Sequence, residues 1–298
     1  MSPVEQAVQH FGGITVAELT SEAELLTRTD RKYLVPLPSA AAIIGALDPD
    51  TRALDVGEER ACDYVSVYFD TPDRLSYLLA AQPRRRRFKL RTRCYAGTGT
   101  AFLEMKTKGG RGATVKDRIP CSPAQLTTLT HEGRAYVAEA LEDLGLDPEL
   151  CGVVRPALAT RYRRTTLLSI DGSRATIDAA LAWNDADGRT LELPGYAIVE
   201  TKSTGRATPL DRALWRHGHR PQSISKFGTG IAAMHPELPR NKWARLLNGP
   251  FAHSGIISTS GSTSISTSTS GITSTTSTCT SSSTSTSTSS PTPAKDAS

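Results

Sequence analysis

The sequence predicts an α+β fold, in which an antiparallel barrel or a strongly curved antiparallel sheet of seven or eight strands carries helices around it. Two observations favour this class. Runs of β-branched and aromatic residues that alternate with polar ones recur along the chain, and several are joined by short glycine-containing loops. Segments with apolar residues at helical spacing separate these runs.

The order of the predicted elements follows from their boundary residues. Pro36 ends the first strand, and Ser39 caps the helix that follows it. Gly97 lies in a hairpin loop, and Gly145 closes the longest helix. The expected strands are residues 28–35, 63–69, 84–95, 101–108, 114–120, 156–170, 174–183 and 195–202. The expected helices are residues 39–47, 123–144, 209–217, 225–234 and 241–247.

Composition divides the chain into three parts. Residues 1–22 form a lead-in, residues 23–248 form one large domain, and residues 249–298 form a tail of almost pure serine and threonine. Because such a tail cannot bury enough apolar surface to offset the entropy of ordering it, we expect it to be disordered. The tail also explains why hydrophobic residues make up only 38% of the 298 residues.

Cysteine usage and the lack of targeting segments favour a cytoplasmic protein. The five cysteines are scattered and form no Cys-x-x-Cys pair, which argues against a zinc site and against a disulfide framework. No apolar run has the length of a transmembrane helix, and the N-terminus lacks the pattern of a signal peptide. We therefore expect a protein of the reducing cytoplasm.

The positions of the charges are more informative than the formal net charge of +5. Residues two apart in a strand share a face. In residues 84–95, arginine and lysine occupy every second position from Arg85 to Arg93, while Phe88, Leu90 and Cys94 point to the other side. Four later strands repeat this division into an apolar face and a charged, mostly basic face.

Two arrangements explain such strands. In one, the charged face is simply exposed to water, as in any half-buried sheet. In the other, the sheet closes and the cations converge in a lumen, where they repel one another unless a polyanion is bound. A basic lumen with a few carboxylates fits phosphate chemistry, because arginine and lysine bind phosphate oxygens and a carboxylate can hold a bridging metal. Nucleic acid is not expected, since few aromatic residues interleave with the basic ones.

A series of short motifs occurs in order between Glu24 and Leu247. They are Arg28-x-Asp30-x-Lys32-Tyr33, Tyr68-Phe69-Asp70-Thr71, Lys89-Leu90-Arg91-Thr92-Arg93-x-Tyr95, Phe102-Leu103-Glu104-Met105-Lys106, Lys116-Asp117-Arg118, Tyr162-x-Arg164, Arg174-x-Thr176-Ile177-Asp178, Val199-Glu200-x-Lys202 and Ser225-Lys226-Phe227. In this order they resemble the VTC-type polyphosphate polymerase domain, within the triphosphate tunnel metalloenzyme superfamily.

The resemblance implies an eight-stranded antiparallel β tunnel with helices packed around it, and Mn²⁺ or Mg²⁺ as cofactor. The implied reaction moves the γ-phosphate of ATP onto a growing polyphosphate chain, so ATP and polyphosphate are the expected partners. The residues implied to act on the phosphates are Arg91, Arg93, Lys106, Arg164, Arg174, Lys202 and Lys226. Those implied to bind substrate beside them are Lys32, Lys89, Lys116 and Arg118. Glu200 is implied as the principal metal ligand and Glu104 as a second one.

The chain departs from the family pattern at two places. Tunnel enzymes that hydrolyse triphosphates begin with Glu-x-Glu-x-Lys, whereas Arg28 and Asp30 stand there in this chain. Losing the first carboxylate removes a ligand for a second metal, which favours polymerisation over hydrolysis. Ser223 stands where other members carry a further lysine. Two alternatives stay open: a tripolyphosphatase or nucleoside triphosphatase on the same scaffold, and a non-catalytic polyphosphate-binding module.

Some of these residues also have a structural interpretation. Glu200 and Lys202 fit an ordinary ion pair, and we expect Asp178 to be an ion-pair partner of Arg174 rather than a metal ligand. Residues 84–87 are four consecutive arginines, expected as a solvated run or an outer funnel for polyanions. The Gly-Thr-Gly sequence at residues 228–230 is expected to serve a helix. The histidines expected at the surface are His131, His217, His219 and His235.

Overall fold

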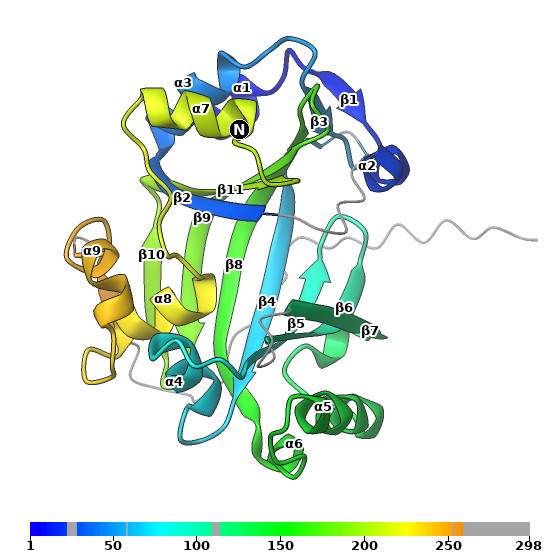
Figure 1. Ribbon diagram of the computed structural model, residues 1–298, viewed down its shortest axis with the longest axis vertical. Helices are drawn as coiled ribbons and strands as arrows, with labels where there is room; N and C mark the ends of the chain where they lie inside the picture. The colour runs from blue at the N-terminus through cyan, green and yellow to red at the C-terminus, as the bar shows by residue number, and fades with distance from the viewer. Residues whose placement is uncertain (23–28, 58, 109–113, 253, 259–298) are drawn as a thin grey trace, which may run out of the picture. The chain divides into compact units, whose positions relative to one another are not determined.

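The computed structural model describes residues 1–22, 29–57, 59–108, 114–252 and 254–258. One large, mostly antiparallel sheet carries helices around it (Figure 1). The strands are β1 (Gly12–Ile14), β2 (Thr29–Pro36), β3 (Arg52–Leu54), β4 (Cys62–Asp70), β5 (Arg87–Tyr95), β6 (Thr100–Lys108), β7 (Thr114–Cys121), β8 (Arg155–Leu168), β9 (Arg174–Asp185), β10 (Arg189–Leu193), β11 (Tyr196–Ser203) and β12 (Ile256–Ser258). The α-helices are α1 (Pro3–Ala7), α2 (Val16–Glu22), α3 (Leu37–Gly45), α4 (Leu75–Ala81), α5 (His131–Asp143), α6 (Leu150–Val153), α7 (Pro209–Arg216), α8 (Lys226–Met234) and α9 (Ala244–Leu247). Two short 3₁₀ turns are η1 (Pro123–Gln125) and η2 (Asn241–Trp243).

Eight strands form a continuous antiparallel path in the order β2-β11-β9-β8-β4-β5-β6-β7, which confirms the predicted α+β class. The predicted closure into a barrel is not seen: in the part of the chain that the structure describes, β2 and β7 form no ladder with each other. At the β2 edge, the backbone N–H of Gln222 donates to the Lys32 carbonyl at 2.7 Å. The segment that leads into α8 therefore takes up part of the edge that a closing strand would use.

The long strand β9 connects two parts of the sheet. Its first half pairs with β11 and its second half with β10, while β8 runs along both. Between the halves, Ala180 has a φ of 50°, and the ladder to β8 shifts register between Arg161 and Arg163. A bulge of this kind bends a strand and increases its twist, so the sheet curves at this point.

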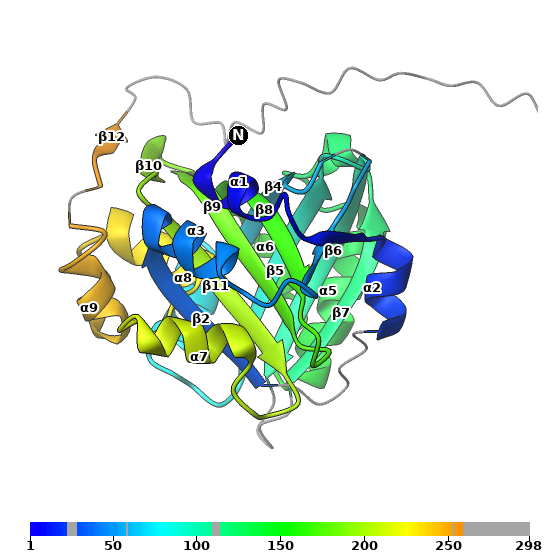
Figure 2. The same cartoon turned by 90° about the horizontal axis from the view of Figure 1, so that it is seen from above.

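The apolar faces of the strands are covered by helices. Tyr33 and Val35 of β2 pack with Ile43 of α3 and Leu214 of α7 in one apolar cluster. These two helices lie beside β2 and β11 (Figure 2). On the other part of the sheet, the apolar side chains of β5 and β6 pack under α5, as with Leu103 and Val137. The alternation therefore gives each strand a core side, and the charged side chains point away from it.

Helix α8 packs on the opposite side of the sheet from α3, α5 and α7. Its Phe227 and Ile231 belong to an apolar cluster with Tyr68, Tyr162 and Trp183. Phe227 stacks on Tyr68, with ring centroids 5.1 Å apart. Figure 1 shows α8 in front of the sheet. This side also carries the predicted charged residues, so α8 lies next to them.

One predicted helix differs in extent from the structure, and several short elements were not predicted. The helix expected over residues 123–144 is divided into η1 and α5, because Thr130 caps α5 by accepting from the Gly133 N–H at 3.1 Å. Helix α4 was not predicted, since its N-cap residue, Arg74, offers no capping side chain. The Asp70 carboxylate caps the helix instead. Asp70 lies six residues before Ser76 in the sequence and accepts from the Ser76 backbone N–H at 2.7 Å. The short strands β1, β3, β10 and β12 were also not predicted.

The ends of the folded part differ from the predicted domain boundaries. The lead-in is part of the fold, because Val4, Val8 and Phe11 are buried and β1 pairs with β3. The predicted tail begins too early, since Phe251 is buried against Trp183 and β12 pairs with β10. The rest of the predicted tail, residues 259–298, lies outside the described residues. None of the helices in the described residues is both long enough and apolar enough to cross a membrane.

Candidate functional site

The register of the strands brings the predicted charged residues to one side of the sheet. Glu200 lies opposite Lys32, Arg164 opposite Asp178, and Glu104 between Arg91 and Arg118 on its two neighbouring strands. Directly opposed residues of an antiparallel pair share a face. We call this side the cationic face, made up of Lys32, Lys89, Arg91, Arg93, Glu104, Lys106, Lys116, Arg118, Arg164, Arg174, Asp178, Glu200 and Lys202.

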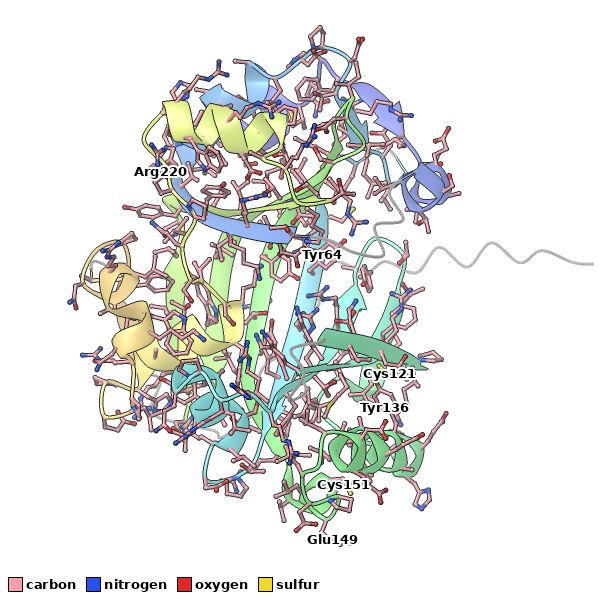
Figure 3. The ribbon with its side chains drawn as sticks, in the orientation of Figure 1. Tyr64, Cys121, Tyr136, Glu149, Cys151 and Arg220 are labelled. Carbon is pink, nitrogen blue, oxygen red and sulfur yellow. The ribbon has the colours of Figure 1, made fainter. Side chains whose placement is uncertain are left out.

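Side chains from distant strands meet across the cationic face. In Figure 3, Tyr64 lies between the β2–β11 part and the β5–β7 part, whereas Cys121 and Tyr136 lie near α5. Tyr64 stacks on Tyr162 at 5.3 Å between centroids, and the Arg164 guanidinium lies 5.0 Å from the Tyr64 ring centroid. Aromatic rings thus support the cations of the face by cation–π contact.

Glu104 is a deeply buried carboxylate of the face, with a side chain 2% exposed. Its Oε2 accepts from Arg91 Nε at 2.7 Å and lies 4.0 Å from Arg93 Nη1, while Lys116 Nζ lies 3.3 Å from Oε1. Burial alone would raise the pKa of Glu104, but Arg91, Arg93 and Lys116 together lower it to about 2. Glu104 is therefore ionised at neutral pH.

Asp178 is the centre of a second group of charges. Arg164 donates to it twice, from Nε at 2.6 Å and from the Nη2 nitrogen at 2.8 Å, and Lys226 Nζ donates to the same carboxylate. Burial opposes ionisation, but these two cations hold the pKa of Asp178 well below its ordinary value. Asp178 is thus an ion-pair partner, but its partners here are Arg164 from β8 and Lys226 from α8. The predicted pairing of Asp178 with Arg174 stays a prediction.

Glu200 is held between two lysines. Lys202 Nζ donates to Oε1 at 2.5 Å, and Lys32 Nζ lies 3.7 Å from Oε2. Burial alone would raise the pKa of Glu200, but Lys32 and Lys202 keep it well below its usual range. Glu200 and Lys202 therefore form an ion pair, as the structural interpretation of their sequence predicts.

Lys89 shows that cations are in excess on this face. It is half-buried, its Nζ donates to Ser225 Oγ at 2.9 Å, and no carboxylate of the described residues lies within 4.0 Å of it. Its cross-strand neighbour is another lysine, Lys106, which in turn lies opposite Lys116. Burial and the nearby charges of Lys32, Arg91 and Lys106 lower the pKa of Lys89 well below its ordinary value. A bound anion would remove this repulsion.

Buried polar atoms on the same face lack hydrogen-bond partners. In the described residues they include Thr160 Oγ1, Tyr162 OH and Thr176 Oγ1. Burial would raise the pKa of Tyr162, yet Arg93, Arg164 and Lys226 lower it below its ordinary value, so the potential here is positive. Unsatisfied buried donors and acceptors are rare and call for an explanation, and a polar, anionic ligand supplies one.

The remaining predicted residues lie at the rim of the face. Arg118 is exposed, and its guanidinium lies 4.4 Å from the Phe102 ring centroid. Lys106 is exposed, and Arg174 lies opposite Lys202 at the end of β9. Arg28, which replaces the usual first carboxylate, lies outside the described residues. Sequence reasoning singled out neither Tyr64 nor Ser225 as a contact of these cations, although Tyr64 has the strand phase of the face.

The donor chemistry of the face fits a divalent cation at Glu200. Mg²⁺ keeps several waters and takes one or two carboxylates together with substrate phosphates. Glu200 is ionised and its side chain is 18% exposed, so an ion that also binds phosphate can approach it. Glu104 is less suitable, because two guanidinium nitrogens of Arg91 already bond to its Oε2.

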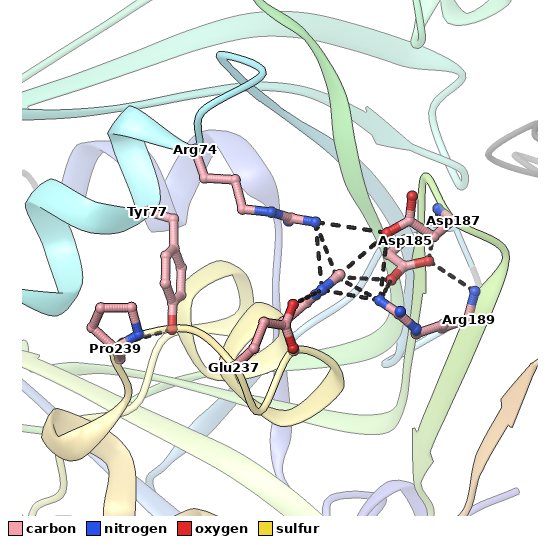
Figure 4. A network of polar contacts seen from close by, with 8 residues as sticks. Arg74, Tyr77, Asp185, Asp187, Arg189, Glu237 and Pro239 are labelled. Carbon is pink, nitrogen blue, oxygen red and sulfur yellow. Dashed lines mark hydrogen bonds and ion pairs between the residues drawn. The ribbon is translucent and has the colours of Figure 1, made fainter.

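A different group satisfies the distances of a metal site, and it corrects one prediction. Among the described residues, Asp185, Asp187 and His235 bring ligand atoms within 4.8 Å of one another (Figure 4). His235, predicted at the surface, is 2% exposed. Arg189 Nη1 lies 2.9 Å from His235 Nδ1, and Arg74 Nη2 lies 3.7 Å from Asp187. These guanidiniums already supply the positive charge that a metal would bring.

Comparison with solved structures finds distant likenesses. HpAC1 from Hippeastrum, described as having a dominant triphosphatase activity, is 16% identical with a TM-score of 0.41, over 67% of this chain and 93% of that one. The PH1819 protein from Pyrococcus horikoshii OT3 is 11% identical with a TM-score of 0.39, over 69% of this chain and 98% of that one. The inorganic triphosphatase NE1496 is 16% identical with a TM-score of 0.28, over 64% of this chain and 79% of that one.

The comparison with curated proteins found no match. A protein-family comparison matched the VTC domain over residues 27–235, which include every residue of the cationic face. The match ends at His235, at the end of α8. The order of motifs, the antiparallel path of eight strands and this match lead to one conclusion: the chain belongs to the VTC domain family.

Proposed function

We propose that this protein is a metal-dependent polyphosphate polymerase that uses ATP. A terminal oxygen of a polyphosphate chain attacks the γ-phosphorus of ATP, the bond from that phosphorus to the β–γ bridging oxygen breaks, and ADP leaves. The observation that carries the proposal is the excess of cations on a partly buried face, above all Lys89 with no carboxylate beside it. ATP as the substrate is consistent with the cytoplasmic location expected from the sequence.

The residues of the face can position and neutralise phosphates. Phosphoryl transfer needs positioning and electrostatic stabilisation more than covalent help from the protein. Arg91 and Arg164 present planar guanidiniums whose free N–H groups suit phosphate oxygens, while Lys89 and Lys226 present point charges from β5 and α8. Glu200 would hold Mn²⁺ or Mg²⁺, and the ion would supply positive charge that offsets the charge of the phosphates.

The test is incubation of the purified protein with ATP and Mn²⁺, followed by electrophoresis for polyphosphate and by measurement of ADP and orthophosphate. We expect ADP and a polymer to increase together. Arg91→Ala and Glu200→Ala should each lower the rate of synthesis by about a hundredfold or more, the usual effect of losing one electrostatic stabiliser. Arg161→Ala is the matched control, because Arg161 is exposed on the opposite face of β8.

The outcomes separate the three functions that remained open. Release of orthophosphate without polymer would identify a triphosphatase and contradict polymerisation. Binding of triphosphate without any turnover would identify a binding module. Full synthesis by Arg91→Ala and Glu200→Ala would show that the polymerase site lies elsewhere than on the cationic face.

A further inference from the structure

A polar network, buried at His235 and Asp185 and exposed at its outer members, surrounds His235 at the end of α8. Its Nε2 lies 3.0 Å from Asp185 Oδ2 and its Nδ1 lies 3.0 Å from Glu237 Oε1. Arg74 Nη2 lies 3.2 Å from Nε2, and Arg189 Nη1 lies 3.5 Å from Asp185 Oδ2. These side chains come from β9, β10, the start of α4 and the segment after α8 (Figure 4). We call this group the His235 network.

The His235 network joins α8 to the second half of β9. Asp185 is the last residue of β9, and its Oδ1 also accepts the Arg189 N–H at 2.8 Å in the turn to β10. His235 is the C-cap residue of α8, and its own N–H donates to the Ile231 carbonyl at 2.9 Å. The contact between His235 and Asp185 therefore connects the end of a helix directly to the end of a strand.

Along its length, α8 approaches its neighbours very closely. A Cβ on Gly230 would lie 2.5 Å from Trp183 Cδ1, and one on Gly228 would lie 2.4 Å from Trp243 Cζ2. These glycines confirm that the Gly-Thr-Gly sequence at residues 228–230 serves the helix. The other contacts of α8 are largely apolar, as at Phe227 and Ile231, and apolar contact has no preferred direction along the helix axis.

The other end of α8 belongs to the cationic face. Ser225, its N-cap, accepts from Lys89 Nζ at 2.9 Å, and Lys226 Nζ donates to Asp178. The Lys226 carbonyl accepts from Trp183 Nε1 at 2.8 Å. Asp178, Trp183 and Asp185 all lie on β9, so one strand holds α8 at both ends.

We propose that His235 is a positioning residue: its contacts with β9 fix α8 along its axis and so hold Ser225 and Lys226 in place on the cationic face. The inference rests on the proposed function in so far as it takes the face to bind phosphates. Directional hydrogen bonds in a buried polar network select one arrangement among several that apolar packing alone would allow. His235 itself does not touch the phosphates.

The test measures the binding of tripolyphosphate by calorimetry, at a temperature where every variant is folded. His235→Leu removes the bond to Asp185 and should raise the Kd by about tenfold, since a small misplacement by a remote change can cost up to about a hundredfold. His235→Gln keeps a donor that can reach Asp185 and should raise the Kd by less than about threefold. The melting temperature of each variant is recorded in parallel.

A double-mutant cycle separates positioning from simple loss of stability. Lys226→Ala alone should weaken binding. If His235 acts through α8, adding His235→Leu to Lys226→Ala should weaken binding by less than about a further twofold, because the group that it positions is already gone. Equal effects of His235→Leu in both backgrounds, or an unchanged Kd with a lowered melting temperature, would overturn the inference.

The failure of this inference can be distinguished from failure of the proposed function. If the wild-type protein binds no tripolyphosphate, the assignment of the cationic face as a phosphate-binding surface is wrong, and so is the positioning role of His235. If the wild-type protein binds tripolyphosphate and His235→Leu binds equally well, the positioning role alone is wrong. If both variants bind as expected but no polymer forms from ATP, the positioning role holds and polymerisation is wrong.

Discussion

The cationic face and the His235 network both bring arginines and carboxylates together, and they differ in how the charges are partnered. In the His235 network, two arginines and a histidine face Asp185, Asp187 and Glu237, and both ring nitrogens of His235 lie near carboxylates. On the cationic face, lysines and arginines outnumber carboxylates, and the buried hydroxyls of Thr160, Tyr162 and Thr176 have no hydrogen-bond partner in the described residues.

This difference separates a structural group from a candidate binding site. Balanced, hydrogen-bonded charges stabilise one arrangement of the chain, whereas an excess of buried cations destabilises the free protein. We expect such an excess at a site where a bound ligand supplies the compensating negative charge. Functional sites are the places where a protein keeps residues that lower its stability. Removal of a cationic side chain should therefore lower the free energy of unfolding in the His235 network. On the cationic face, removal of a cation that has no carboxylate beside it should raise the free energy of unfolding.

A large loss of stability is expected in the His235 network. His235→Leu leaves the buried Asp185 without its ring partner and should lower the free energy of unfolding by about 3 kcal/mol, as for one broken partner of a buried pair. Denaturant unfolding measures this change. Glu237→Gln is the matched control, because the Glu237 side chain is 62% exposed. It should change the free energy of unfolding by less than about 0.5 kcal/mol.

On the cationic face, Glu104 makes stability depend on acid pH. Its pKa of about 2 lies below its ordinary value of 4.5, so its contribution is complete above pH 4.5 and is lost as the pH falls towards 2. This shift corresponds to about 3 kcal/mol, so Glu104→Gln should be less stable than the wild type near pH 7 by about that amount. The difference between the two unfolding free energies should narrow below pH 4.5. A difference that stays constant down to pH 3 would contradict this assignment.

Lys89→Met should test the difference between the two regions, because it removes a half-buried cation that has no carboxylate of the described residues within 4.0 Å. We expect the free energy of unfolding to rise by about 1 kcal/mol while the affinity for tripolyphosphate falls by about tenfold. Thermal melting and calorimetric titration measure the two changes. A loss of both stability and affinity would mean that Lys89 is needed for the fold rather than for an anion.

Tyr162→Phe should have the smallest effect. The hydroxyl is buried without a hydrogen-bond partner, so its removal should leave stability unchanged or raise it by up to about 1 kcal/mol. If the hydroxyl donates to a bound phosphate, the affinity for tripolyphosphate should fall by about threefold to tenfold. Thr165→Val on the same strand, whose side chain faces the apolar side, is the control for binding and should leave the affinity unchanged.

The strand-borne part of the site could be predicted because a strand has a period of two. Phe88, Leu90 and Cys94 of β5 point to the core under α5, so Lys89, Arg91 and Arg93 had to share the other face. The face of the sheet to which a side chain points depends only on its position along its own strand. It does not depend on which strand lies beside it, and the cross-strand partners became visible only in the structure.

What could not be predicted depends on contacts between distant segments. Asp178 meets Lys226, 48 residues further along the chain, because α8 packs on the side of the sheet to which Asp178 points. His235 carries no sequence signal of burial, since its partners come from β9 and β10. The closed barrel was wrong because strand count and alternation do not determine whether β2 meets β7, and Gln222 instead bonds to β2.

The central claim is that the unbalanced charges of the cationic face bind a triphosphate. Calorimetric titration with tripolyphosphate and Mg²⁺ tests it most directly, on the wild type, Arg164→Ala and the outer-face control Arg161→Ala. The account predicts one binding event in the wild type, a loss of affinity of about tenfold or more in Arg164→Ala, and no change in Arg161→Ala. Absence of binding in the wild type, or equal affinities in all three proteins, would contradict it.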